Sequence, residues 1–157
     1  MSVCKWLKRG VFAGKIAPCV HDAKKRGVKF CCGHGQGAFS WTVAEIALSE
    51  GLYPDSISTD LHMGCINGPA YDQPTVMTKF LMLGMPLAHV IHASTLGAAE
   101  TIGWGDTIGT LGVGRAADIA LFALSPIDCQ LEDVTGQLRH CSGAENASFM
   151  SLCAVYV

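Results

Sequence analysis

The sequence has little charge. Only 15% of the 157 residues are charged, against about 25% in typical soluble proteins, and 50% are apolar. A disordered chain is excluded, because disorder requires low hydrophobicity and high charge. The formal net charge of −2 gives no basic surface for nucleic acid or anionic membranes, so we expect neither partner. This composition is typical of part of a larger domain or of one face of a homo-oligomer.

Long hydrophobic runs are absent as well. Gly, Pro, His or Asp repeatedly interrupts the apolar segments, and none approaches the roughly 20 residues of a membrane-spanning helix. The start, MSVCKWLKRG, has charge but no following apolar stretch, so we expect no signal peptide. The eight cysteines include no Cys-x-x-Cys pair. This pattern favours free thiols in a reducing compartment, and we expect the cytoplasm.

The periodicity predicts an α/β fold. We expect a helix-prone lead over residues 1–27, a strand over 28–32, a helix over 39–49 and a strand over 56–59. A strand–helix–strand unit implies parallel strands with a right-handed crossover. Further expected elements are helices over 74–83 and 86–102 and a strand over 117–122. Residues 125–157 show no clear period, and 149–157 is a strand or a frayed end.

Asp60 is the most informative single residue. It follows the second predicted parallel strand directly, and His62 comes two residues later. An aspartate at the carboxyl end of such a strand can bind a metal ion and accept a proton from a bound water. The alternative is an ordinary loop or capping residue.

A glycine-rich turn, Gly33-His34-Gly35-Gln36-Gly37, follows the first predicted strand. It lacks the spacing of a phosphate-binding loop, because neither G-x-x-x-x-G-K-[ST] nor G-x-G-x-x-G occurs in the chain. Its small residues would let the backbone and His34 approach a ligand, or they would simply form a tight turn. No G-x-S-x-G motif occurs either, which argues against a serine hydrolase.

Two other groups of residues can bind metals. His89 and His92 are spaced i, i+3 on a predicted helix, although nothing nearby completes a site, and an exposed helix face explains them better. Cys31 and Cys32 are adjacent in the first predicted strand. They would serve as thiolate ligands or as buried strand residues.

Several motifs follow one another along residues 20–124. They are R-G-V-K-F at 26–30, G-H-G-Q-G-A-F-S-W at 33–41, Y-P-D-S-I-S-T-D-L-H at 53–62, N-G-P at 67–69, D-Q-P-T-V-M at 72–77, L-G-M-P-L at 83–87 and G-T-L-G-V-G-R-A-A-D-I-A at 109–120. Together they resemble the amidohydrolase superfamily, in its deacetylase-like branch, often labelled dihydroorotase-like. The last motif resembles the return of the chain to the small β domain that flanks these barrels.

The resemblance implies a metal-dependent hydrolase on a distorted TIM barrel. Such enzymes use one or two divalent ions, usually zinc, to activate water for attack on an amide or ester carbonyl. Asp60 matches the aspartate at the end of strand eight, which binds metal and transfers the proton. We therefore predict that Asp60 is catalytic and a metal ligand. His34 and His62 are expected to project from loops on the same face and to bind substrate.

The resemblance covers only the C-terminal part of such an enzyme. The family's first-strand His-x-His pair is absent, and so are its carboxylated lysine and the histidines after strands five and six. We expect the last barrel units over residues 1–103, the return to the small β domain over 104–124, and a divergent tail over 125–157. We therefore predict a partial barrel, taken from an enzyme that hydrolyses a small-molecule amide or ester. Its isolated chain would be inactive, because the metal site is incomplete.

Two other interpretations stay open. The chain would be a pseudo-enzyme or partner subunit that docks through its half-barrel surface. It would otherwise be a small domain that uses Cys31 or Cys32 in redox chemistry. Relatives usually have Asp-Val where this chain has these two cysteines.

Overall fold

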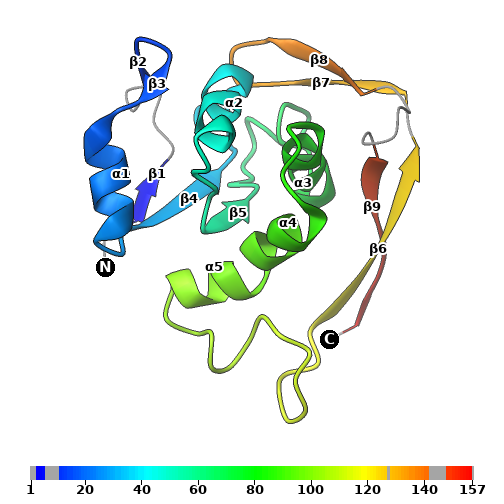
Figure 1. Cartoon of the computed structure of the whole chain (residues 1–157). Coiled ribbons are helices and arrows are strands. Elements are labelled where there is room, and N and C mark those ends of the chain that lie inside the picture. Colours follow the sequence, from blue (N-terminus) through cyan, green and yellow to red (C-terminus); the bar gives the residue numbers. More distant parts are fainter. Residues whose placement is uncertain (1–2, 6–10, 127, 142–147, 157) are drawn as a thin grey trace.

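A three-stranded parallel sheet organises the first half of the chain (Figure 1). The computed structural model describes residues 3–5, 11–126, 128–141 and 148–156. The strand order is β1 (Val3–Lys5), β4 (Lys29–Gly33) and β5 (Ser56–Ser58), and both pairings are parallel. The predicted parallel pairing of the strands over 28–32 and 56–59 is therefore confirmed. Within the described ranges the sheet stays open, and no closed barrel is formed.

Five helices of the described chain accompany this sheet. They are α1 (Pro18–Lys25), α2 (Trp41–Ser49), α3 (Gln73–Met82), α4 (Leu87–Ser94) and α5 (Leu96–Thr101). Helix α2 is the crossover between β4 and β5, and its buried residues are Trp41, Ala44 and Ala47. Helix α3 buries seven consecutive residues, so it runs through the core rather than along the surface. None of the described helices is long and apolar enough to cross a membrane.

The N-terminal lead differs from the expected helix. Val3–Lys5 is a strand, and β2 (Val11–Phe12) forms a hairpin with β3 (Lys15–Ile16). Helix α1 then ends near Gly27, as the sequence predicts. The strand β1 takes its backbone partners from β4, with Val3 paired to Lys29. Such pairing with a distant segment overrides the local helix propensity of a short segment. Residues 6–10 of the expected lead lie outside the described part.

The single helix expected over 86–102 is also wrong. The chain breaks at Thr95, where φ is −129° and ψ is −98°, and α5 starts in a new direction. Gly97 lies directly against the loop before β5. A Cβ added there would overlap the carbonyl oxygen of Asp55. The break therefore lets α5 pack close to the sheet at a place where only glycine fits.

The second half of the chain forms two antiparallel pairs. Strand β6 (Ile119–Pro126) pairs with β9 (Ser148–Tyr156), and β7 (Cys129–Glu132) pairs with β8 (Leu138–Cys141). The strand expected over 117–122 thus begins at Ile119 and extends further. Figure 1 shows β7 and β8 beside α2, while β6 and β9 run along another side of the molecule. The segment over 125–157, which shows no clear period, therefore contains strands. Of the two alternatives for its apolar end, a strand or a frayed end, the strand is confirmed.

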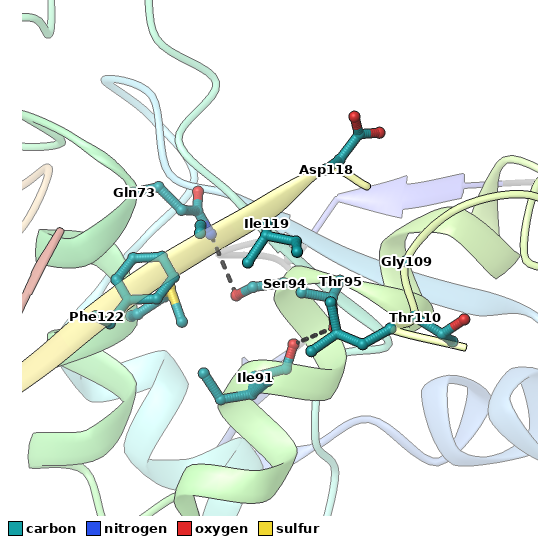
Figure 2. A pocket seen from close by; sticks show the side chains of 12 residues that line it. Gln73, Ile91, Ser94, Thr95, Gly109, Thr110, Asp118, Ile119 and Phe122 are labelled. Atoms are coloured by element: carbon teal, nitrogen blue, oxygen red, sulfur yellow. Dashed lines mark hydrogen bonds between the residues drawn. The ribbon is translucent and has the colours of Figure 1, made fainter. Parts of the chain in front are cut away.

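A cavity of about 480 Å³ lies between the helices α3 and α4 and the strand β6 (Figure 2). Its lining is mainly apolar, with Met77, Ile91 and Phe122 among its residues. The amide of Gln73 spans one end, where Nε2 donates to the carbonyl oxygen of Ile57 at 3.2 Å and to Ser94 Oγ at 3.2 Å. In the part of the chain that is described, β5 is an edge strand, so Gln73 satisfies a carbonyl on its unpaired side.

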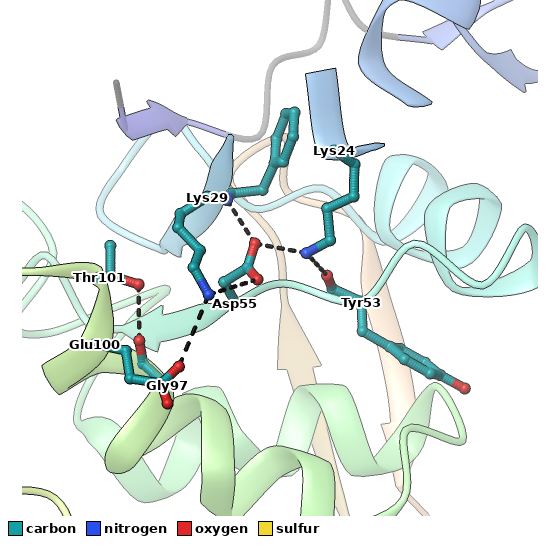
Figure 3. Close-up of polar contacts among 8 residues, drawn as sticks. Lys24, Lys29, Tyr53, Asp55, Gly97, Glu100 and Thr101 are labelled. Carbon is teal, nitrogen blue, oxygen red and sulfur yellow. Dashed lines mark hydrogen bonds and ion pairs between the residues drawn. The ribbon is translucent and has the colours of Figure 1, made fainter. Parts of the chain in front are cut away.

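An ionic network holds the amino-terminal ends of the strands (Figure 3). Asp55 precedes β5, and its Oδ2 accepts hydrogen bonds from Lys24 Nζ at 2.5 Å and from the Phe30 amide at 2.7 Å. Lys29 Nζ lies 3.7 Å from Asp55 Oδ1 and 3.7 Å from Glu100 Oε2. The carboxylate of Asp55 therefore joins α1, β4 and the loop before β5.

We expect Asp55→Ala to lower the free energy of unfolding by about 2–3 kcal/mol, because it removes charge-assisted bonds and leaves the Phe30 amide without its acceptor. Urea titration measures the loss. The matched control is Glu100→Gln, which removes a longer and more exposed ion pair and should cost less than about 0.5 kcal/mol. Equal losses in the two variants would contradict the central place of Asp55.

Candidate functional site

The glycine-rich turn after β4 is hydrogen-bonded to the end of β5. The His34 amide donates to the Ser58 carbonyl at 2.9 Å, and the Gly35 amide donates to the Thr59 carbonyl at 2.8 Å. Because β4 and β5 are parallel, both of their carboxyl ends lie at one edge of the sheet. The residues that follow the two strands are therefore brought together, as in the strand-end sites of α/β proteins.

Asp60 lies against this turn. A Cβ added at Gly35 would come within 2.9 Å of Asp60 Oδ2, and one at Gly33 within 3.3 Å of the Asp60 Cβ. Gly35 has a φ of +47° and Asp60 a φ of +48°, so both backbones are in the left-handed region. Asp is one of the few residues with a side chain that tolerates this conformation. The glycines thus permit a close approach of the turn to an exposed carboxylate.

His62 belongs to the loop that follows Asp60. Its side chain is exposed, and its Nδ1 accepts a hydrogen bond from the Gly64 amide at 3.1 Å. The side-chain amide of Gln36 donates to the Gly64 carbonyl. This contact ties the loop after β5 to the turn after β4, so Asp60 and His62 lie beside the same turn.

His34 does not project from the turn, and that expectation is wrong. Its side chain is fully buried and stacks on Phe39, with ring centroids 5.0 Å apart. The ring nitrogen Nδ1 lies 2.9 Å from the Gly35 carbonyl oxygen, and Nε2 lies 2.8 Å from Lys79 Nζ. The ring can be buried because both of its nitrogens have hydrogen-bond partners and its face has a stacking partner.

Lys79 is the residue at this site that the sequence reasoning missed. It lies in the middle of α3, and its side chain has no exposed surface. Nζ donates to the Pro69 carbonyl at 2.6 Å and to the Glu132 carbonyl at 2.6 Å, in addition to its contact with His34. The only sequence signal was a lone charge inside the apolar helical run at 76–82.

Burial sets the protonation states of this pair. It lowers the pKa of the Lys79 ammonium to about 8, although Glu132 and Asp133 oppose the shift. Burial, together with the charge of Lys79, lowers the pKa of the His34 ring to about 4. At neutral pH the site therefore combines a charged lysine with a neutral imidazole.

His34 should lower the stability of the chain by roughly 3 kcal/mol as the pH drops from about 6.5 to about 4. In this range the His34 ring binds a proton in the unfolded chain but not in the folded chain. Above pH 6.5 the ring is neutral in both states. Lys79 stays charged throughout, and Asp133, whose pKa lies below its usual range, stays ionised. Urea titrations at several pH values give the slope. His92→Asn, at an exposed histidine, is the control and should keep the same dependence of the free energy of unfolding on pH. If the unsubstituted chain showed no such dependence, the lowered pKa of His34 would be contradicted.

The described residues do not form a metal site on their own. No group of three His, Cys, Asp or Glu residues in the described ranges could hold a metal ion. Asp60 is one candidate ligand, and zinc sites need at least three protein ligands. His89 and His92 are exposed on α4, and His89 packs on Tyr53, 5.1 Å away, near the amino-terminal strand ends.

Cys32 gives no support to redox chemistry. Cys32 is buried in β4, and burial, with a smaller effect of Cys31, raises the pKa of its thiol far above the usual value. A neutral thiol is neither a metal ligand nor a nucleophile. Cys32 therefore acts as a core residue, in agreement with the buried-strand interpretation.

The fold and the site define a mixed α/β protein with an acidic residue at the carboxyl ends of parallel strands. The model of the amidohydrolase family matches residues 7–148, and the chain belongs to this family. A deacetylase of Agrobacterium fabrum is 40% identical over 112 residues, which is 71% of this chain and 27% of that protein. A deacetylase of Enterococcus faecalis is 36% identical over 126 residues, or 80% of this chain and 34% of that protein.

Solved structures show the same relationship. The crystal structure of an adenine deaminase superposes with a TM-score of 0.80 and 33% identity, and covers 88% of this chain and 36% of that chain. A dihydroorotase structure gives a TM-score of 0.75 with 33% identity over the same shares. The chain thus spans about a third or less of the length of these relatives.

Proposed function

We propose that this chain is the part of a deacetylase-like, metal-dependent amidohydrolase that carries the proton-transferring aspartate. The observation that supports it most directly is the placement of Asp60, which follows β5 and lies against the glycine turn after β4. In this proposal β4 and β5 are the last two strands of a TIM-like barrel. The segment over 104–124 returns to a small β domain, and 125–157 is a divergent tail.

In the proposed reaction Asp60 acts as a general base and then as a general acid. Its carboxylate accepts a proton from the water that attacks an amide or ester carbonyl, and returns it to the leaving amine or alcohol. The exposed loop that holds His62 lies on the same side and would contact the substrate. His34 would influence the site through the turn, because its ring is buried.

The family implies a divalent metal, which we propose is zinc in the complete enzyme. No group of three possible ligands occurs among the described residues, so in this proposal the ligands that join Asp60 come from outside them. We therefore propose that the isolated chain is inactive. We propose that the substrate of the complete enzyme is a small-molecule amide or ester, and that neither nucleic acid nor membrane is a partner. The chain would act in the cytoplasm, and it could assemble as a homo-oligomer.

A non-catalytic role is the second candidate. The observation that favours it is the absence of a three-residue metal group from the described part of the chain. In this case the chain would be a pseudo-enzyme that docks through its open sheet and helices. Bound metal separates the two proposals, since a docking subunit needs none.

A chimera tests the proposal. This chain replaces the segment that it matches in the Agrobacterium fabrum deacetylase, and the purified chimera is assayed with zinc on a panel of N-acetylated amines, amino acids and esters. We expect hydrolysis by the chimera, stoichiometric zinc in it, and neither in the isolated chain. A folded chimera that binds no zinc and hydrolyses nothing would overturn the enzymatic proposal and favour the docking role.

A further inference from the structure

The buried lysine of α3 has no part in the proposed reaction. Its neighbours on the same helix, Val76, Met77 and Phe80, are also fully buried. A buried ammonium costs free energy unless each of its donors is satisfied. Lys79 therefore needs an explanation other than filling the core, which an apolar side chain would do at lower cost.

The three acceptors of Lys79 come from three different segments. His34 belongs to the turn after β4, Pro69 to the loop after β5, and Glu132 to the end of β7. A lysine ammonium has three N–H donors, so all of them are used. The ammonium also lies 5.5 Å from the centre of the Phe39 ring, on which the His34 ring stacks. Both parts of the pair are thus held from several sides.

The lysine also fixes the tautomer of the histidine. An ammonium group has no acceptor, so the Nε2 atom of His34 must accept its hydrogen bond. The ring proton is then on Nδ1, which donates to the Gly35 carbonyl at 2.9 Å. The Gly35 amide in turn donates to the carbonyl of Thr59, the residue before Asp60. A continuous set of hydrogen bonds therefore links Lys79 to the backbone beside the candidate catalytic carboxylate.

We propose that Lys79 is a positioning residue, which acts through the His34 ring to hold the turn over 33–37 against Asp60. The proposal rests on the proposed role of Asp60. Because a Cβ added at Gly35 would come within 2.9 Å of Asp60 Oδ2, the turn leaves the carboxylate no spare room on this side, and a shift of the turn would change the carboxylate's orientation. Misplacement by about an ångström is enough to cost an enzyme most of its rate.

The first experiment needs no substitution. Nitrogen-15 NMR of the full chain at pH 7 reports which ring nitrogen of each histidine carries the proton. We expect His34 to be neutral and protonated on Nδ1. A His34 ring that is protonated on Nε2, or that is charged, would overturn the proposal, because the lysine could not then be the donor to this ring.

The second experiment uses hydrogen exchange of the Gly35 amide. Lys79→Met keeps the length of the side chain and removes the donors, and we expect exchange at Gly35 to become about tenfold faster or more. The matched control is Thr78→Val, the neighbouring buried position of α3, whose hydroxyl bonds to the Pro74 carbonyl within the helix. Equal acceleration in both variants would show a general loss of stability and would overturn the proposal.

A double variant covers the case in which Lys79→Met fails to fold. His34→Phe combined with Lys79→Met removes both polar partners and keeps an aromatic ring on Phe39, so it should recover much of the stability. We expect fast exchange at Gly35 to remain. Slow exchange in the double variant would mean that Lys79 only satisfies a buried ring. These readouts involve no turnover, so their outcome is separate from whether Asp60 is catalytic.

Discussion

Asp60→Asn in the active chimera should lower kcat by about 10²–10⁴-fold, with a small change in KM. Asparagine is nearly isosteric with aspartate and also tolerates the left-handed backbone at φ +48°. The turn at Gly35 should therefore stay in place, while the group that accepts the proton is lost. Initial rates over a range of substrate concentrations, with circular dichroism to check folding, measure the effect.

The matched control for this substitution is Asp118→Asn. Asp118 is exposed and lies just before β6, beside the cavity of Figure 2 rather than beside the glycine turn. We expect its kcat to stay close to that of the unmodified chimera. Turnover by Asp60→Asn at the level of this control would remove Asp60 from the mechanism and leave it as a loop residue.

Asp133→Ala should lower the free energy of unfolding of the chain by about 2–4 kcal/mol. Asp133 follows β7, and its Oδ2 accepts from the Trp41 amide at 3.0 Å, the first residue of α2. The N-cap residue Ser40 does not cap the helix, because its side chain makes no capping hydrogen bond. Asp133 thus supplies both an acceptor and a negative charge to the start of the helix.

The same carboxylate also closes the turn between β7 and β8. Its Oδ1 accepts from the Thr135 amide at 2.7 Å, the Thr135 hydroxyl at 2.6 Å and the Gln137 amide at 3.1 Å. Burial raises the pKa of the Asp133 carboxyl, but these bonds and the one from Trp41 outweigh it, and the pKa lies below its usual range. The carboxylate is therefore ionised at neutral pH, and Asp133→Ala removes both its charge and its hydrogen bonds at this pH.

Thermal and urea unfolding of Asp133→Ala measure this effect. Asp128→Asn is the control in the same hairpin, since the Asp128 side chain is 79% exposed and forms a surface pair with His140. It should change the free energy of unfolding by less than about 0.5 kcal/mol. Similar values for the two variants would mean that the hairpin is not docked through Asp133.

The central strand–helix–strand unit was predictable because local signals agree there. Apolar strand segments, a glycine turn and a helix with an apolar face follow one another over residues 28–59, and a helical crossover between two strands indicates parallel pairing. Residues 125–157 contain no such agreement of local signals. The strand β7 reads Cys-Gln-Leu-Glu and β8 reads Leu-Arg-His-Cys, without a clear alternation of apolar and polar residues. Their placement depends on a partner far away in sequence.

The candidate site was predictable to the same extent. Asp60 and the glycine turn could be placed together, because both follow parallel strands directly. Lys79 and Asp133 could not, since each of them bonds to backbone groups of other segments: Pro69 and Glu132 for the lysine, and Trp41 for the aspartate. Backbone acceptors and donors leave no mark in a sequence, so a buried charge looks like an ordinary polar residue.

The amide of Gln73 also has a consequence for the association of one molecule with another. An uncovered edge strand offers its backbone to any passing strand, which is a common route to aggregates. On the unpaired side of β5 the carbonyl of Ile57 is already occupied by Gln73 Nε2, which also holds Ser94. An incoming strand must break these bonds before it forms its own. The Gln73 side chain thus protects the unpaired side of β5 from another strand, and this protection can be reversed because it consists of hydrogen bonds alone.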